Sequence, residues 1–256
     1  VVKCMSIEFC IPPNHPALPG HFPDNPIVPA VVIIQEVARR LTDLTGRQID
    51  EVRQLRLQQP VLPGQRITMS CEPRGSNAWR VTLAAEAEVL ARGVFAERSE
   101  SLAAPEQGAV GGDLPRSASA AYRLLPHADD MALIDTFETD DIGKAHTSIL
   151  YVAGHPLEEA GHLLPWVSLE YAAQLYGCHS LLSNQVTSSG EAMGGAFIVM
   201  VRTLRINVDR PLRSGQRVDL TLQVLSEQGA AAQCEFDARV GADTWCRGAF
   251  TVVSGD

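Results

Sequence analysis

The sequence has no long hydrophobic run and no excess of positive charge. Its longest apolar stretch covers residues 27–34 and contains Pro29, whereas a membrane-spanning helix needs about 20 consecutive apolar residues. The net charge is −9, and nucleic-acid-binding domains normally carry a basic surface. We therefore expect neither a membrane span nor a nucleic-acid partner.

Paired cysteines and a secretion leader are also missing. The six cysteines of the 256-residue chain show no Cys-X-X-Cys pair and no regular spacing, which predicts reduced core thiols rather than a disulfide framework or a zinc site. No charged, then apolar, then small-residue leader opens the chain, so we expect no signal peptide and a cytoplasmic location. Because the first residue is Val, a longer parent chain stays open.

An internal repeat divides the chain. Residues 60–70 (PVLPGQRITMS) resemble residues 211–221 (PLRSGQRVDLT), and residues 91–96 (ARGVFA) resemble residues 246–251 (CRGAFT). Between the copies lies a stretch rich in Ala, Gly, Ser and Pro without hydrophobic periodicity, which is typical of a linker. The sequence therefore predicts two domains, residues 1–97 and 121–256, joined by a flexible linker, residues 98–120.

Each repeat predicts the same α+β unit. An apolar helix is expected at residues 31–44 and again at 166–182, because the apolar residues there lie on more than one helix face. Alternating β-type segments surround each helix, and the expected ranges are 4–11, 54–59, 66–72, 79–90, 93–97, 131–138, 195–208, 216–225, 231–240 and 244–253. Two such units in one chain can pair their sheets into one continuous sheet.

The segment LPGHFPDNPIVPAVVIIQEVA, residues 18–38, carries the strongest chemical signal. Pro23, Pro26 and Pro29 fix the backbone of the loop that begins with His21, and Pro29 precedes the helix at a position that favours proline. The helix N-terminus offers unpaired N–H groups. An imidazole held beside such a group suits proton abstraction next to a polarised carbonyl.

This segment resembles the active-site motif of the FabA/FabZ-type 3-hydroxyacyl-ACP dehydratases, GHFPxxPxxPGV. The first half is especially similar to ApeI-type dehydratases of aryl polyene clusters. In the second half, LLPHADDMALIDTF (residues 124–137) and LLPWVSLEYAAQ (residues 163–174) resemble FabZ-like and ApeP-type motifs. The resemblance implies a double hotdog, with two central helices each wrapped by an antiparallel sheet.

The resemblance also implies site residues. His21 matches the catalytic histidine, and Glu170 matches the acidic residue of the helix. Ala30 replaces the glycine whose N–H polarises the thioester carbonyl, and the Ile27 carbonyl matches the group that holds the histidine ring. His21 is then expected to remove the α-proton, while Glu170 helps protonate and expel the 3-hydroxyl.

The two possible composite sites are not equivalent. At the family's spacing from His21, the first half carries Gln35 instead of an acid, and His155 in the second half lacks the three-proline frame. Because the family builds each site from two subunits, we expect one working site from His21 and Glu170 and a degenerate one from His155 and Gln35. His15 and His127 are interpreted as local structural residues in proline-flanked turns, and His155 and His162 as structural or vestigial rather than catalytic.

The implied function is dehydration of 3-hydroxyacyl thioesters on an acyl carrier protein to trans-2-enoyl products, in fatty-acid- or polyene-type biosynthesis. We expect no cofactor and no metal, since the phosphopantetheine arm arrives with the substrate. The expected partners are the carrier protein, the acyl thioester and other synthase components. Two alternatives stay open: a non-catalytic carrier-binding module with both sites decayed, and a hotdog acyl thioesterase, which the HFPxxPxxP frame disfavours. A hydratase with a paired Asp/His signature is also disfavoured, because no such spacing follows His21.

Overall fold

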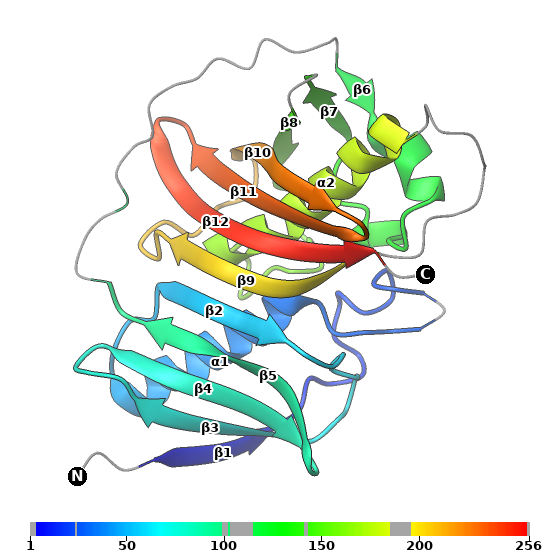
Figure 1. Cartoon of the computed structure of the whole chain (residues 1–256). Coiled ribbons are helices and arrows are strands. Elements are labelled where there is room, and N and C mark those ends of the chain that lie inside the picture. The colour runs from blue at the N-terminus through cyan, green and yellow to red at the C-terminus, as the bar shows by residue number, and fades with distance from the viewer. Residues whose placement is uncertain are drawn as a thin grey trace.

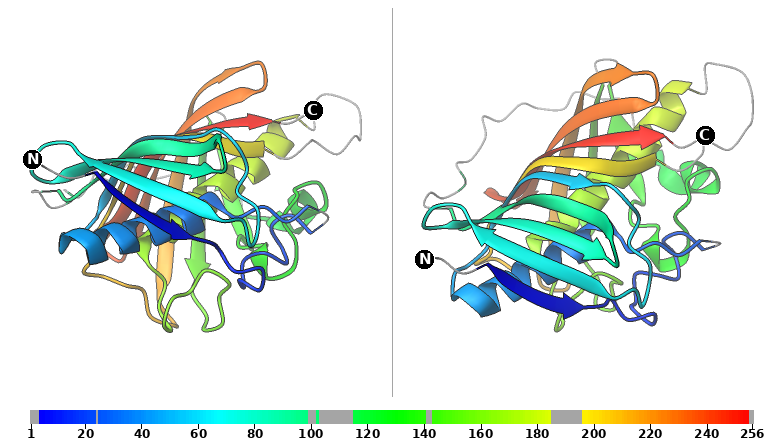
Figure 2. Two further views of the ribbon diagram at one scale, coloured as in Figure 1. Left: turned by 90° about the horizontal axis from the view of Figure 1, so that it is seen from below. Right: turned by 60° about the horizontal axis from the view of Figure 1, so that its bottom comes forward.

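One continuous antiparallel sheet forms the framework of the molecule. The computed structural model describes residues 4–23, 25–98, 102, 115–140, 143–184 and 196–254. Within them, the sheet has 12 strands and stays open, in the order β1-β3-β4-β5-β2-β9-β12-β11-β10-β8-β7-β6. Both long helices lie on the same face of this curved sheet (Figures 1 and 2).

The first half supplies five strands and the helix α1. Its elements are β1 (Met5–Phe9), α1 (Ala30–Thr45), β2 (Glu51–Leu57), β3 (Ile67–Pro73), β4 (Ala78–Ala85) and β5 (Glu88–Ala96). Helix α1 begins directly after Pro29 and ends at Gly46, whose left-handed φ of 66° allows its N–H to reach the Thr42 carbonyl. The proline therefore sets where the helix starts, close to the His21 loop.

The second half repeats this plan around the helix α2. Its elements are β6 (Arg116–Ser117), η1 (Ala118–Arg123), η2 (Asp129–Met131), β7 (Thr136–Thr139), β8 (Lys144–Leu150), η3 (Pro165–Val167), α2 (Ser168–Asn184), β9 (Ala196–Ile206), β10 (Arg217–Gln228), β11 (Ala231–Val240) and β12 (Asp243–Ser254). Counted outward from the centre, β2-β5-β4-β3 of the first half matches β9-β12-β11-β10 of the second. The sequence repeat is therefore also a structural repeat.

The two halves meet where β2 pairs with β9. Val52 lies opposite Leu204 and Leu55 lies opposite Val201, and all four of these side chains are buried. The apolar core consequently runs from one half into the other beneath the seam. The prediction of two α+β units sharing one continuous sheet is confirmed.

Local differences from the expected elements have physical causes. The hairpin between β4 and β5 turns after Ala85, with Glu86 at a positive φ of 53°. Because no Gly, Pro or Asn marks this turn, the prediction of a single strand over residues 79–90 was wrong. Strand β8 was missed because Ala145 and Thr147, which share its buried face with Ile149, give a weak apolar signal. The strand expected over 131–138 is limited to Thr136–Thr139.

The expected linker is described only in part. Residues 99–101 and 103–114 lie outside the described residues, and within the predicted linker Arg116–Ser117 forms β6 against β7. All six cysteines are free; four are buried, while Cys4 and Cys10 are exposed, so the expectation of core thiols is correct for four. Within the described part of the chain, no helix is long and apolar enough to cross a membrane.

Candidate active site

The proline-rich loop of the first half fixes His21 in a buried position. The ring is 8 % exposed, and its Nδ1 lies 2.8 Å from the Ile27 carbonyl oxygen, the group that the family resemblance assigned to it. Because a carbonyl oxygen only accepts hydrogen bonds, Nδ1 carries the proton and Nε2 keeps its lone pair. Burial lowers the pKa of His21, against the opposing charge of Glu170. His21 is therefore placed as a neutral base at neutral pH.

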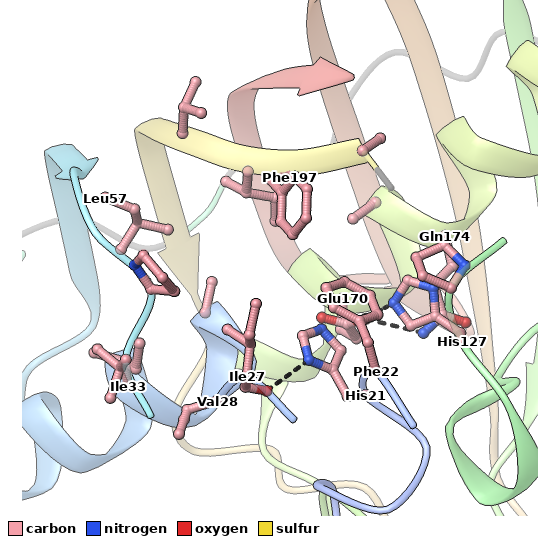
Figure 3. Close-up of a pocket in the computed structure, with 18 of the residues that line it drawn as sticks. His21, Phe22, Ile27, Val28, Ile33, Leu57, His127, Glu170, Gln174 and Phe197 are labelled. Carbon is pink, nitrogen blue, oxygen red and sulfur yellow. Dashed lines mark hydrogen bonds and ion pairs between the residues drawn. The ribbon is translucent and has the colours of Figure 1, made fainter. Parts of the chain in front are cut away.

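Helix α2 of the second half brings Glu170 to the same place (Figure 3). Glu170 is 3 % exposed, and ligand atoms of Glu170, His21 and His127 all lie within 4.8 Å of one another. Burial alone raises the pKa of Glu170, but hydrogen bonds and charges from His127, His21 and Gln174 outweigh it and lower the pKa to about 2. The carboxyl group is therefore ionised in the resting site.

The hydrogen bonds of Glu170 are one-sided. Its Oε1 accepts from His127 Nε2 at 3.1 Å and from Gln174 Nε2 at 2.9 Å. Oε2 has no hydrogen-bond partner among the described residues. Gln174 lies one turn further along α2 and is itself fixed, since its Oε1 accepts from the Tyr122 hydroxyl at 2.6 Å. One carboxylate oxygen is thus anchored, while the other is left for a ligand.

His127 approaches from a loop of the second half that is bonded directly to the His21 loop. His21 and His127 form an isolated antiparallel bridge, and the Ala128 N–H donates to the Gly20 carbonyl at 3.1 Å. A side chain at position 20 would place its Cβ 2.1 Å from the Ala128 oxygen, so only glycine allows this approach. The loops that bear the two histidines are therefore joined across the two halves.

An apolar cavity of about 340 Å³ opens from these groups. Most of its lining is aliphatic or aromatic; His21, His127, Glu170 and Gln174 contribute polar groups, and Gln58 and Gln59 also line it. Ala30, the first residue of α1, also lines the cavity, and its N–H has no partner among the described residues, as is usual in a first helical turn. The apolar lining residues are Phe22, Ile27, Val28, Ile33, Leu57, Val61, Leu125, Ala173, Phe197, Ile198 and Val199.

The two histidines and Glu170 have the composition of a metal site, but their surroundings fit acid–base chemistry better. A metal-bound histidine normally donates its second ring N–H to an acceptor. His21 has such an acceptor in Ile27, whereas Nδ1 of His127 is buried without a partner. His127 Nε2 is already directed at Glu170.

The expected second site needs a correction. His155 accepts the Leu157 N–H at Nδ1 (3.1 Å) and contacts the Tyr171 hydroxyl through Nε2 (3.2 Å). The first contact matches that of His15, whose Nδ1 accepts the Ala17 N–H at 3.2 Å. His155 is thus the structural counterpart of His15 rather than of His21.

The structure does not bring His155 to Gln35. Gln35 is 6 % exposed and its Nε2 has no partner. It lines a separate small cavity of about 110 Å³, together with His15, Glu36 and Glu159 but without His155. Among the described residues, the predicted pairing of His155 with Gln35 therefore has no support from a hydrogen bond or a shared cavity.

Sequence reasoning missed His127 and Gln174. The turn LLPHAD was interpreted as local structure, although its histidine belongs to a segment that resembles a family motif. Gln174 lies in the LEYAAQ segment, one helical turn after Glu170. Both signals were present in the motifs, but only the fold shows that these side chains face the carboxylate.

Two family models match the two halves of the chain in order. Residues 2–94 match the family model of the ApeI dehydratase, and residues 119–256 match that of the ApeP dehydratase. The chain belongs to the ApeP-like dehydratases. The segment that matches the ApeI model contains His21, and the segment that matches the ApeP model contains Glu170, His127 and Gln174.

Two curated relatives are FabZ enzymes described as 3-hydroxyacyl-[acyl-carrier-protein] dehydratases. The chain is 34 % identical to the protein of Magnetococcus marinus over 99 residues, which cover 30 % of this chain and 65 % of the relative. It is 29 % identical to that of Granulibacter bethesdensis over 92 residues, which cover 30 % of this chain and 54 % of the relative. The chain therefore spans roughly half to two thirds of the length of these relatives.

Solved structures share the whole fold at low identity. The dehydratase domain of RzxB from Pseudomonas fluorescens has a TM-score of 0.78 at 11 % identity, covering 96 % of this chain and 93 % of that one. A dehydratase domain of a mycocerosic acid synthase-like polyketide synthase has a TM-score of 0.77 at 11 % identity, covering 100 % and 93 %. The dehydratase domain of PpsC from Mycobacterium tuberculosis has a TM-score of 0.72 at 15 % identity, covering 98 % of this chain and 94 % of that one. The fold is thus a double hotdog.

Proposed function

We propose that this protein removes water from 3-hydroxyacyl thioesters on an acyl carrier protein and releases trans-2-enoyl products. One observation carries the proposal: a neutral buried imidazole and an ionised carboxylate, from opposite halves, lie close together and line one largely apolar cavity. Such a pair can take a proton from one carbon while it handles a hydroxyl on the next. One composite site per chain follows, since Gln35 and His155 do not form a second.

The proton balance assigns different tasks to the two groups. His21 removes the α-proton through Nε2, and the Cα–H electrons form the new double bond as the Cβ–O bond breaks. The 3-hydroxyl first donates a hydrogen bond to the free Oε2 of Glu170, because this carboxyl has its pKa lowered to about 2 and holds no proton of its own. The proton gathered by His21 then reaches the departing oxygen, directly or through Glu170, and water leaves.

The thioester carbonyl is polarised by the first turn of α1 in this proposal. The Ala30 N–H is unpaired and its residue lines the cavity, and a helix N-terminus carries partial positive charge. Negative charge that develops on the carbonyl oxygen during proton abstraction is stabilised there. Alanine keeps the backbone donor that glycine offers in the family motif.

The cavity lining supports an apolar acyl chain as the substrate. Apart from the reacting groups and the two glutamines Gln58 and Gln59, its lining is mainly aliphatic or aromatic, which suits the burial of hydrocarbon. The PpsC dehydratase domain was solved in complex with C12:1-CoA, so a thioester of coenzyme A is a useful analogue beside the carrier-bound one. We propose the acyl carrier protein and other synthase components as partners in fatty-acid- or polyene-type biosynthesis.

Several arginines that an acidic carrier protein could contact are engaged in ion pairs within the chain. Arg205 and Arg53 contact Glu51, while Arg39 and Arg40 contact Glu36. Acidic side chains of a carrier protein would therefore have to compete with Glu51 and Glu36 for these arginines.

Turnover of 3-hydroxyacyl carrier proteins of graded chain length, followed by mass spectrometry, tests the proposal. We expect loss of one water from the acyl group with the thioester intact, and no loss with His21→Ala. Release of a free acid would instead indicate a thioesterase. Tight carrier binding without turnover, on both carrier-bound and coenzyme A-linked substrates, would indicate a non-catalytic module.

A further inference from the structure

His127 has no assigned role, although it contacts the reacting carboxylate. We propose that His127 is a positioning residue: its Nε2–H holds Oε1 of Glu170, so that Oε2 is presented to the 3-hydroxyl of the substrate. The inference rests on the proposed function, because it concerns how that site is assembled. The contact that carries it is the 3.1 Å approach of His127 Nε2 to Glu170 Oε1.

The surroundings of His127 decide which nitrogen carries the proton. Nδ1 is buried and has no hydrogen-bond partner, whereas Nε2 faces an ionised carboxylate. With the proton on Nδ1, a buried N–H donor would be unpaired and the lone pair of Nε2 would face the negative charge of Glu170. With the proton on Nε2, only the acceptor Nδ1 is unpaired, which costs less free energy. The ring therefore donates from Nε2 to Glu170.

Two donors from different segments converge on the same oxygen. Gln174 donates to Oε1 from within α2, and His127 donates from the loop that precedes η2. With only the Gln174 contact, which comes from its own helix, the carboxylate could turn about its terminal bond and offer either oxygen. The second donor, attached to another segment, removes this freedom and leaves Oε2 free.

The position of His127 is imposed by the other half of the molecule. Its backbone bridges to His21, its ring meets that of His21 edge-on with centroids 5.2 Å apart, and it meets Phe22 in the same way at 5.3 Å. The 8 % exposure of His127 leaves little room for another rotamer. The base and the group that orients its partner are thus set by one pair of bridged loops.

Loss of the hydrogen bond from His127 to Glu170 should change the pKa of Glu170, whereas a mere loss of packing should not. The hydrogen bond and charge of His127 help lower the pKa of Glu170 against the effect of burial. A variant without a donor at position 127 should raise the pKa of Glu170, whereas a variant with a donor in the same place should not. Glutamine provides such a donor, because its Nε2 reaches about as far from the backbone as the Nε2 of histidine.

The experiment compares His127→Leu, His127→Gln and the control His155→Leu in the full chain. His155 is a half-buried histidine whose ring contacts the Tyr171 hydroxyl, but it does not line the apolar cavity. We expect His127→Leu to lower kcat by about 10- to 100-fold, the size of a lost charge-assisted hydrogen bond, with KM within about threefold of the wild type. His127→Gln should recover most of kcat, and His155→Leu should leave it unchanged.

Carbon-13 NMR titration of the Glu170 carboxyl, assigned with Glu170→Gln, gives a readout that needs no turnover. The pKa should rise in His127→Leu and stay near the wild-type value in His127→Gln. Equal loss of kcat in both variants, or an unchanged carboxyl titration in His127→Leu, would overturn the positioning role. A wild-type protein without dehydratase activity would refute the proposed function instead, and the titration would still decide whether His127 controls the carboxylate.

Discussion

Replacing Glu170 with glutamine isolates the contribution of its negative charge. The substitution keeps the shape of the side chain and an oxygen that can accept from His127 and Gln174, the donors now bound to Oε1. It removes the charge that faces the imidazolium formed when His21 takes the α-proton. The relevant atoms lie within 4.8 Å, and a charge pair at that separation contributes about 3.5 kcal/mol at an effective dielectric constant of about 20.

This energy corresponds to a decrease of a few hundred-fold in kcat, at about 1.4 kcal/mol per factor of ten. The assay is single-turnover dehydration of a 3-hydroxyacyl carrier protein, with thermal melting to verify folding. Gln35→Ala serves as the matched control, because Gln35 is a buried polar residue of the other helix and lines a different cavity; its turnover should stay within about threefold of the wild type. Similar losses in the two variants would refute the composite site of His21 and Glu170.

Three further predictions concern stability and substrate choice. The folded-state pKa of Glu170 is lowered from 4.5 to about 2, so its ionised form should stabilise the fold by about 3 kcal/mol above pH 4.5. This contribution should decrease as the pH falls, with about 2 kcal/mol lost by pH 3. Urea unfolding at pH 6 and pH 3 should therefore show a larger decrease in the free energy of unfolding for the wild type than for Glu170→Gln. Gly20→Ala should cost about 1–3 kcal/mol in urea unfolding and lower kcat, because its Cβ would overlap the Ala128 oxygen; an unchanged melting temperature would contradict that contact. Val199→Phe, which places a ring in the cavity wall, should raise KM for long acyl chains more than for short ones, and an equal change for both would place the acyl chain elsewhere.

The regular elements were largely predictable from local patterns. Periodicity indicated both helices, and the repeated GQR and RG-x-F segments indicated that the sheet is built twice. Errors arose where a turn lacked its usual residues, as at Glu86, or where small and hydroxylated side chains served as core, as at Thr147. In both places tertiary packing outweighs local propensity.

The residues of the candidate site were predictable only where they lie in a distinctive sequence segment. His21 and Glu170 lie in distinctive segments, and the fold brings them together from opposite halves. His127 lies in an ordinary proline turn, and its role depends on the bridge to His21, which no local pattern encodes. The comparison of His155 with His21 depended on a histidine and its spacing, which match easily, while the hydrogen bond that distinguishes the two residues is visible only in three dimensions.

The pairing of β2 with β9 has a consequence for dilution. If the two halves were separate chains, the fraction of assembled sites would obey the law of mass action and fall as the protein was diluted below the dissociation constant. Within one chain each half meets its partner at a fixed effective concentration, and the seam from Glu51 to Arg56 closes in cis. Specific activity should therefore be constant over dilution, and the site should persist even where each synthase component is scarce.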